Sequence, residues 1–204
     1  MIYRSLVFWL LLPIYILFPN VTYGQFEDVD YAKSAAKRLQ EGVLVVRLPV
    51  NAPKIRYFKA KLKEVEGEKQ KIRLADDLQR TLSINQQKFE AIHEALKENY
   101  TFSRFLILPD SNYNAFVAGE KHVFINENGQ VDPRITLEDK KYFLLISGEN
   151  EDQWVLVNSD LKRLDNPFPH RATIFLSGIT RVINCKKYYF KQMRWFQQKL
   201  SALI

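Results

Sequence analysis

Cysteine and glycine are scarce in this sequence, which has one cysteine, Cys185, and seven glycines among its 204 residues. A single thiol forms neither an internal disulfide nor a Cys-x-x-Cys redox pair. A thiolate nucleophile would need a histidine and an orienting group, and the nearest histidine, His170, shares no motif with it. The sequence therefore favours a buried structural thiol at Cys185.

The few glycines and histidines exclude the signatures of several other sites. The loop Pro49–Pro53 contains no glycine and loses a backbone N–H at Pro53, so it cannot cradle a phosphate group. The nucleophile elbow Gly-x-Ser-x-Gly is absent. His93, His122 and His170 lack the paired spacing of metal ligands. The sequence therefore predicts no metal and no cofactor.

The first 24 residues have the pattern of a secretory leader. Arg4 supplies a short positive region, Leu6–Phe18 is an apolar run, and Thr22 and Gly24 are the small residues before the expected cut. As a helix the apolar run would span about 20 Å, whereas the hydrocarbon core of a bilayer is about 30 Å thick. We therefore expect an exported protein, periplasmic or secreted, without a permanent membrane span after cleavage; a retained membrane anchor is the alternative.

The remaining residues, 25–204, suit a single domain with a sizeable core. The chain has 30 lysines and arginines against 23 aspartates and glutamates, which gives a net charge of +7. This excess is scattered over several expected helices, which is typical of a solvated basic surface. Because export argues against nucleic acid as a partner, we expect an envelope protein or an anionic surface.

Two short apolar runs predict the centre of the fold. Gly42–Pro49 contains the β-branched run Val43–Val46, and Phe102–Asp110 contains a similar run before Pro109. Runs that are apolar on both faces are typical of strands buried between layers, as in parallel sheets. Since a long helical tract separates them, we predict a parallel pair with a helical crossover; an antiparallel pair is the alternative.

The tract between these strands predicts helix from residue 53 to residue 98, with Asn51 as its cap. Apolar residues recur at helical spacing, first at Ile55, Phe58, Leu62 and Val65. One straight helix of this length would measure about 69 Å, against a diameter of about 40 Å for such a domain. The tract must therefore bend, turn back or protrude, with Gly67 as the first expected break and Ser83–Asn85 as the second. If it protrudes, its tip is a candidate partner-binding surface.

Amphipathic helices are expected at both ends of the domain. The first, Asp28–Gln40, has Asp28 or Asp30 as its cap and Gly42 as its stop. Its apolar face consists of Tyr31, Ala35 and Leu39. The second runs from Cys185 to Leu203 and has basic residues off an apolar stripe, which favours core packing; a membrane-surface helix and a dimer contact are the alternatives. That stripe consists of Tyr189, Met193, Phe196, Leu200 and Leu203.

Several short strands complete the expected sheet. They lie at His122–Asn126, Lys141–Ser147, Gln153–Asn158 and Thr173–Leu176, with Gly148–Asp152 as a hairpin loop. The sequence therefore predicts a single-domain α/β fold. Its mixed sheet has about five or six strands, a long helical crossover and an amphipathic C-terminal helix.

Polar residues follow the two central strands. In parallel α/β sheets, ligands bind beyond the carboxyl ends of the strands, where Asn51 and Asp110 are expected. Asn112 and Tyr113 extend this edge with an amide and an aromatic surface. The sequence thus predicts a ligand-binding edge at these four residues. Turn chemistry explains the same residues without a ligand.

Four segments carry a resemblance. The leader ends in Val21-Thr22-Tyr23-Gly24, and the others are Gly42–Pro49, Asn99–Phe102 and Val123–Pro133. They resemble an exported protein family of Bacteroidetes, with the similarity extending over about Ala35–Phe168. No activity is known for that family, so the resemblance implies export and carries over no site residue.

Three hypotheses about function remain. The first is a non-enzymatic binding or structural protein of the cell envelope, which the absence of catalytic motifs favours. The second is a small-molecule enzyme with a carboxylate-centred site near Asp110. The third is a peripheral membrane protein that uses its basic C-terminal helix.

Overall fold

The computed structural model describes residues 27–138, 141–147, 153–169 and 184–204. Three expected features lie outside these ranges: the leader, the loop Gly148–Asp152 and the strand Thr173–Leu176. None of the helices in the described ranges is both long and apolar enough to cross a membrane.

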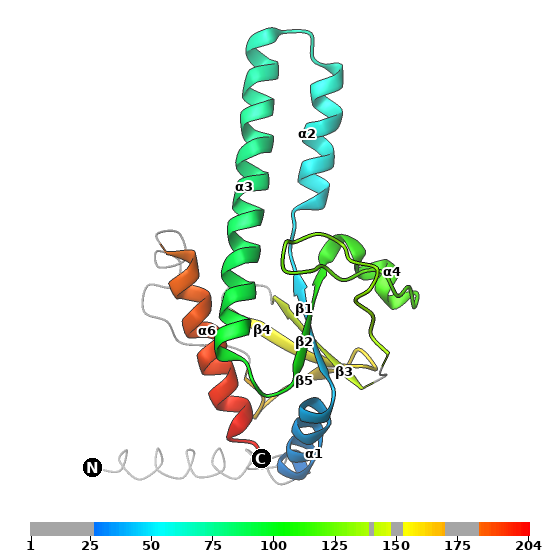
Figure 1. The fold of residues 1–204 in the computed structure, drawn as a ribbon, viewed down its shortest axis with the longest axis vertical. Coiled ribbons are helices and arrows are strands. Elements are labelled where there is room, and N and C mark those ends of the chain that lie inside the picture. Colours follow the sequence, from blue (N-terminus) through cyan, green and yellow to red (C-terminus); the bar gives the residue numbers. More distant parts are fainter. Residues whose placement is uncertain (1–26, 139–140, 148–152, 170–183) are drawn as a thin grey trace, which may run out of the picture.

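A five-stranded mixed sheet forms the centre of the molecule (Figure 1), as the sequence predicts. The strand order is β2-β1-β3-β4-β5; the first three strands are parallel, and β3, β4 and β5 are antiparallel neighbours. The strands are β1 (Val43–Leu48), β2 (Arg104–Pro109), β3 (Tyr142–Ser147), β4 (Trp154–Asn158) and β5 (Arg163–Leu164).

The two central apolar runs are parallel neighbours, so the alternative of an antiparallel pair is wrong. Their register pairs Val43 with Arg104 at one end and Leu48 with Pro109 at the other. Both strands therefore end at the same edge of the sheet. Pro109 has no N–H to continue the ladder, which suits a position at the end of an edge strand.

Side chains of β1 alternate between two buried layers, as the two-residue period of a strand requires. Leu44, Val46 and Leu48 face a core shared with the helices α1 (Glu27–Glu41), α3 (Glu68–Asn99) and α6 (Cys185–Ser201). Val43 and Val45 face a second core, built on Phe116, Val123 and Phe124. Each fully buried aliphatic side chain contributes roughly 1.5–3 kcal/mol, so both faces of β1 stabilise the fold.

The N-terminal helix differs from expectation at its start and on its face. Asp28 and Asp30 both lie within α1, which is described from Glu27 onward, so neither of them caps the helix. Ala35 and Leu39 are buried, but Tyr31 is 52% exposed. Gly42 ends the helix as predicted, and a Cβ there would lie 2.3 Å from the Lys141 carbonyl oxygen, so only glycine fits this close approach.

The crossover tract both turns back and protrudes (Figure 1). It consists of α2 (Ala52–Glu64) and α3, an antiparallel pair separated by a short turn at Gly67, the first expected break. The second expected break is wrong, because α3 runs through Ser83–Asn85 without interruption. Asn51 occupies the N-cap position of α2, as predicted, although its side chain makes no capping hydrogen bond.

The C-terminal helix packs against α3, in agreement with the core-packing interpretation. Four residues of its predicted stripe are buried, while Leu203 is only half-buried and lies beyond the end of α6. The apolar stripe is therefore covered by the fold and is not displayed toward a membrane. The buried four are Tyr189, Met193, Phe196 and Leu200.

The segment after β2 differs most from expectation. Asp110–Asn112 forms a 3-10 turn (η1) that continues into the short helix α4 (Tyr113–Val117). The strand predicted at His122–Asn126 is not formed; only Ile125 makes isolated bridges, to Ile107 and Val131. The turn at residues 126–130 takes the chain away from β2 after that single bridge, so no ladder develops. The two-residue strand β5 was not predicted.

Candidate functional site

The four residues of the predicted ligand-binding edge lie close together, and each of them makes contacts within the protein. The Asp110 carboxylate accepts a hydrogen bond from the Val50 N–H at 3.1 Å. This bond joins the end of β2 to the chain that leaves β1. Asp110 therefore ties the carboxyl ends of the two central strands to each other.

Asn51 is engaged in a second tie, with a residue that the sequence analysis did not identify. Its side-chain NH2 donates to the Asn85 Oδ1 at 2.8 Å, and the Asn85 NH2 donates to the Val50 carbonyl. Asn51 adopts a left-handed backbone conformation (φ 53°), which asparagine tolerates better than most residues. The polar residues at Ser83–Asn85 were the sequence signal for this contact. They mark the hydrogen bonds of Asn85 to Asn51 and Val50 and not a break in the helix.

Asn112 and Tyr113 also have partners within the chain. The Asn112 NH2 donates to the Val123 carbonyl at 3.0 Å, which fixes the segment that covers the second core. The Arg47 guanidinium lies 4.2 Å from the centre of the Tyr113 ring, in a cation–π contact. All four predicted residues thus cluster around the carboxyl ends of β1 and β2, where their contacts are structural.

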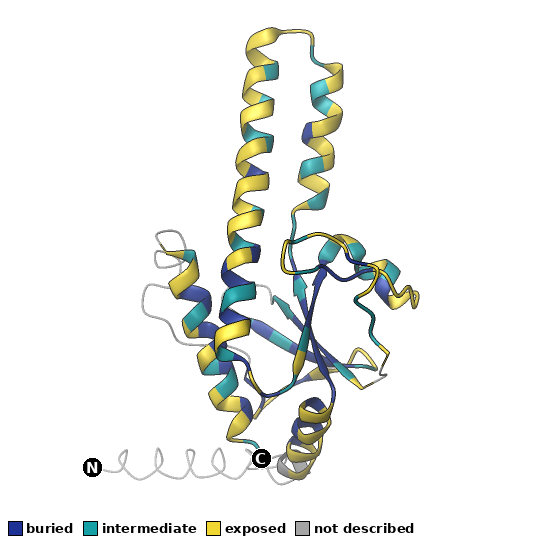
Figure 2. Cartoon of the chain, in the orientation of Figure 1, coloured by how far each residue is buried: buried dark blue, intermediate teal, exposed yellow. Residues whose placement is uncertain are grey.

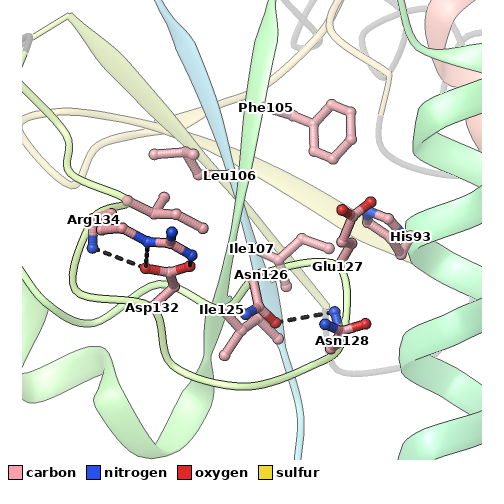
Figure 3. Close-up of a pocket in the computed structure, with 11 residues that line it drawn as sticks. His93, Phe105, Leu106, Ile107, Ile125, Asn126, Glu127, Asn128, Asp132 and Arg134 are labelled. Carbon is pink, nitrogen blue, oxygen red and sulfur yellow. Dashed lines mark hydrogen bonds and ion pairs between the residues drawn. The ribbon is translucent and has the colours of Figure 1, made fainter.

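A cavity of about 420 Å³ lies elsewhere, on the outer side of the edge strand β2 (Figure 3). It is bounded by β2, by His93 of α3 and by the segment that carries Ile125 to Ile135. None of the four residues of the predicted edge lines it. Sequence reasoning missed this cavity because its walls come from three segments that only the tertiary fold brings together.

One of the two acidic groups of this cavity, the Asp132 carboxylate, is neutralised by its neighbour, while Glu127 is the other. The Asp132 carboxylate accepts hydrogen bonds from Arg134 Nε at 3.0 Å and Nη2 at 2.7 Å (Figure 3). The side chain of Arg134, followed by its backbone N–H, holds the pKa of the Asp132 carboxyl well below its usual range. A permanently ionised, paired carboxylate serves poorly as a general acid or base.

The histidine of the cavity is held between aromatic rings. His93 stacks on Phe89 with ring centroids 5.6 Å apart and contacts the edge of Phe105 at 6.3 Å. Burial lowers the pKa of His93, and the positive charge of Lys97 lowers it further, while Glu127 and Glu94 act in the opposite direction. His93 is therefore a half-buried histidine that packs against aromatic rings.

The walls of the cavity are polar and aromatic, and its titratable side chains beside the Asp132–Arg134 pair are His93 and Glu127. Within the described ranges, no cluster of three histidine, cysteine, aspartate or glutamate side chains could hold a metal ion.

The most distinctive surface is the hairpin of residues 52–85, called here the arm. Only Phe58 and Thr81 are buried along it, and Figure 2 shows its helices largely exposed. The arm carries nine lysines and arginines against five aspartates and glutamates, a net charge of +4 out of +7 for the whole chain. Four large apolar side chains are also exposed there, namely Tyr57, Ile72, Leu82 and Ile84.

Replacing Asp110 tests the tie at the base of the arm. Asp110→Ala leaves the Val50 N–H without its acceptor. We expect the free energy of unfolding to fall by about 1 kcal/mol and the Val50 amide to exchange its hydrogen faster. The exposed neighbour Asn114→Ala is the control and changes stability by less than about 0.5 kcal/mol. Unaltered stability and exchange in Asp110→Ala would show that the tie is unimportant.

The environment of His93 predicts a pH dependence of stability. Its pKa is lower in the folded chain than the ordinary 6.5, so the unfolded chain binds the proton more readily. The contribution of His93 to the free energy of unfolding is therefore fully present well above pH 6.5. It declines as the pH falls from 6.5 toward the lower pKa of the folded chain. NMR titration of the His93 ring should give a midpoint below pH 6.5. The substitution His93→Gln should make the free energy of unfolding vary less with pH between about pH 7.5 and 5.5. A midpoint at or above pH 6.5 would contradict this prediction.

Comparisons with known proteins give no relative from which a role could be carried over. No family model matches the sequence, and neither a curated protein nor a solved structure matches the chain. The function of this chain is therefore inferred from its own sequence and structure.

Proposed function

We propose that this chain is a non-enzymatic binding protein of the cell envelope and that it holds its partner through the arm. The compartment depends on the leader-like pattern of residues 1–24. The binding role depends on the arm, a helical hairpin that projects from the sheet and adds little to either core (Figure 1).

Helix α3 is longer than the crossover between β1 and β2 requires. A six-residue strand spans about 20 Å, and the part of α3 from residue 86 to residue 99 spans about 21 Å. That lower part alone is long enough to return the chain to the start of β2. The arm is therefore an addition to the crossover that the sheet itself does not require.

The surface of the arm supports binding more than structural support. Exposed apolar side chains on a basic background, away from the cores, are typical of a contact surface. The enzyme hypothesis has less support, because Asp110 is occupied by the Val50 N–H. The membrane-surface hypothesis for α6 has less support, because its apolar stripe is buried.

Capture of partners from the envelope fraction of the source cells tests this proposal. The full-length protein is compared with a shortened arm that lacks Phe58–Glu64 and Glu68–Leu74. This deletion removes one heptad from each helix and preserves the turn and the seam spacing. We expect the full-length protein to retain a saturable partner and the shortened arm to lose it, while circular dichroism shows the body still folded.

A double variant at the predicted edge, Asp110→Ala with Tyr113→Ala, is the matched comparison. It should retain the partner as the full-length protein does. If the double variant loses the partner and the shortened arm retains it, the binding site is at the edge of the sheet and not on the arm. Absence of any saturable partner would overturn the binding role.

A further inference from the structure

The two helices of the arm are in contact, and their least exposed residues follow the spacing of a coiled-coil seam. On α2 the seam comprises the stripe that begins at Ile55, and on α3 it comprises residues spaced alternately by three and four. Assigning these residues to heptad positions a and d also assigns a heptad position to every other residue of the two arm helices. The α3 residues of the seam are Lys71, Leu74, Leu78, Thr81 and Asn85.

A second stripe runs beside the seam on α3 and has no partner within the described part of the chain. Ile72, Ala75, Gln79 and Leu82 recur at spacings of three, four and three, and all are exposed. Ile72 is 55% and Leu82 is 38% exposed. In the heptad they occupy positions b and e, which border the seam on one flank. A helix with two adjacent stripes of this kind is typical of a bundle of three helices.

Basic residues of α2 lie on this same flank. Arg56, Lys59 and Lys63 occupy positions b, e and b, and in an antiparallel pair the e positions of both helices share one flank. All three side chains are exposed. None of them belongs to an ion pair formed among the described residues, whereas Lys61 on the other flank pairs with Glu64 at 2.8 Å. Their charge is therefore uncompensated within the described structure.

We propose that this docking flank, made of the second stripe and the three basic residues, binds an acidic amphipathic helix of a partner protein. The partner helix completes a three-helix bundle, with its apolar side on Ile72, Ala75 and Leu82 and its carboxylates on Arg56, Lys59 and Lys63. This inference rests on the proposed binding function of the arm and specifies the chemistry of the partner.

The distribution of charge favours this occupant over two others. A second copy of the chain would bring the same three basic residues, and like charges in contact are unfavourable. An anionic lipid surface approached by the tip would meet Glu66 and Glu68, which are exposed at the turn. An acidic helix lying along the side of the arm meets the basic residues and avoids the tip. The expectation of a partner at the tip is thereby replaced by a partner along one flank.

Two synthetic peptides test the chemistry directly. Both have about three heptads and the same leucine stripe, but one has glutamates and the other lysines beside it. We expect the glutamate peptide to bind the full-length protein at least about tenfold more tightly than the lysine peptide. In NMR spectra it should shift the amides of Ile72, Ala75 and Leu82 more than those of Ile84 and Tyr57, which lie on the opposite flank.

Charge reversal on each flank provides the matched variants. The double variant Lys59→Glu with Lys63→Glu should bind the glutamate peptide at least about tenfold more weakly and should bind the lysine peptide more tightly. Arg73→Glu with Arg80→Glu makes the same change of charge at exposed positions off the docking flank, and should alter binding by less than about threefold. Equal effects of the two double variants would mean that binding depends only on the net charge of the arm, which would overturn the assignment of the docking flank.

The remaining outcomes separate this inference from the proposed function. Binding of neither peptide, concentration-dependent self-association through the arm, or preferential binding to phosphatidylglycerol vesicles would overturn the acidic helix as occupant. If Lys59→Glu with Lys63→Glu keeps the envelope partner that the shortened arm loses, the arm binds but the docking flank is wrong. If the shortened arm keeps that partner, the proposed function itself is wrong.

Discussion

Parallel pairing of β1 and β2 is the constraint on which the rest of the structure depends. Because both strands end at the same edge, with Leu48 opposite Pro109, the chain must travel back along the whole sheet before it can enter β2. The lower part of α3 makes this return and covers one face of the sheet beside α6. The arm is extra length inserted before the return, and it points away from the sheet because α2 leaves at the carboxyl end of β1 (Figure 1).

The residues at the carboxyl ends of the central strands fix the start of the arm. Asp110 and Asn85 both bind the backbone of Val50, which lies two residues before the arm begins. One tie comes from the end of β2 and the other from α3, so the start of the arm is fixed from two sides. A surface held in this way can present a preformed binding flank, since less conformational freedom is lost when a partner arrives.

Local patterns predicted the elements well, and tertiary contacts decided what local patterns could not. The apolar run at Val43–Val46 and the turn at Gly67 are encoded by neighbouring residues, and both were predicted. At His122–Asn126 the residues suit a strand, yet the turn that follows leaves Ile125 with a single bridge to β2. Asn51 and Asp110 were correctly placed at the edge of the sheet, but the sequence does not reveal that Asn85 and Val50 lie within hydrogen-bonding distance of them. The cavity beside β2 and the docking flank were missed for the same reason, because each joins residues from separate elements.

The distance along α3 tests the central claim, a continuous helix that carries the arm away from the sheet. Spin labels at Glu68→Cys and Lys97→Cys, in a Cys185→Ser background, lie 29 residues apart on α3. Pulsed electron–electron double resonance should give a narrow distribution centred at about 44 Å between backbone positions, allowing for the label linkers. A broad distribution, or a maximum below about 30 Å, would show that α3 bends near Ser83–Asn85 and that the arm does not project.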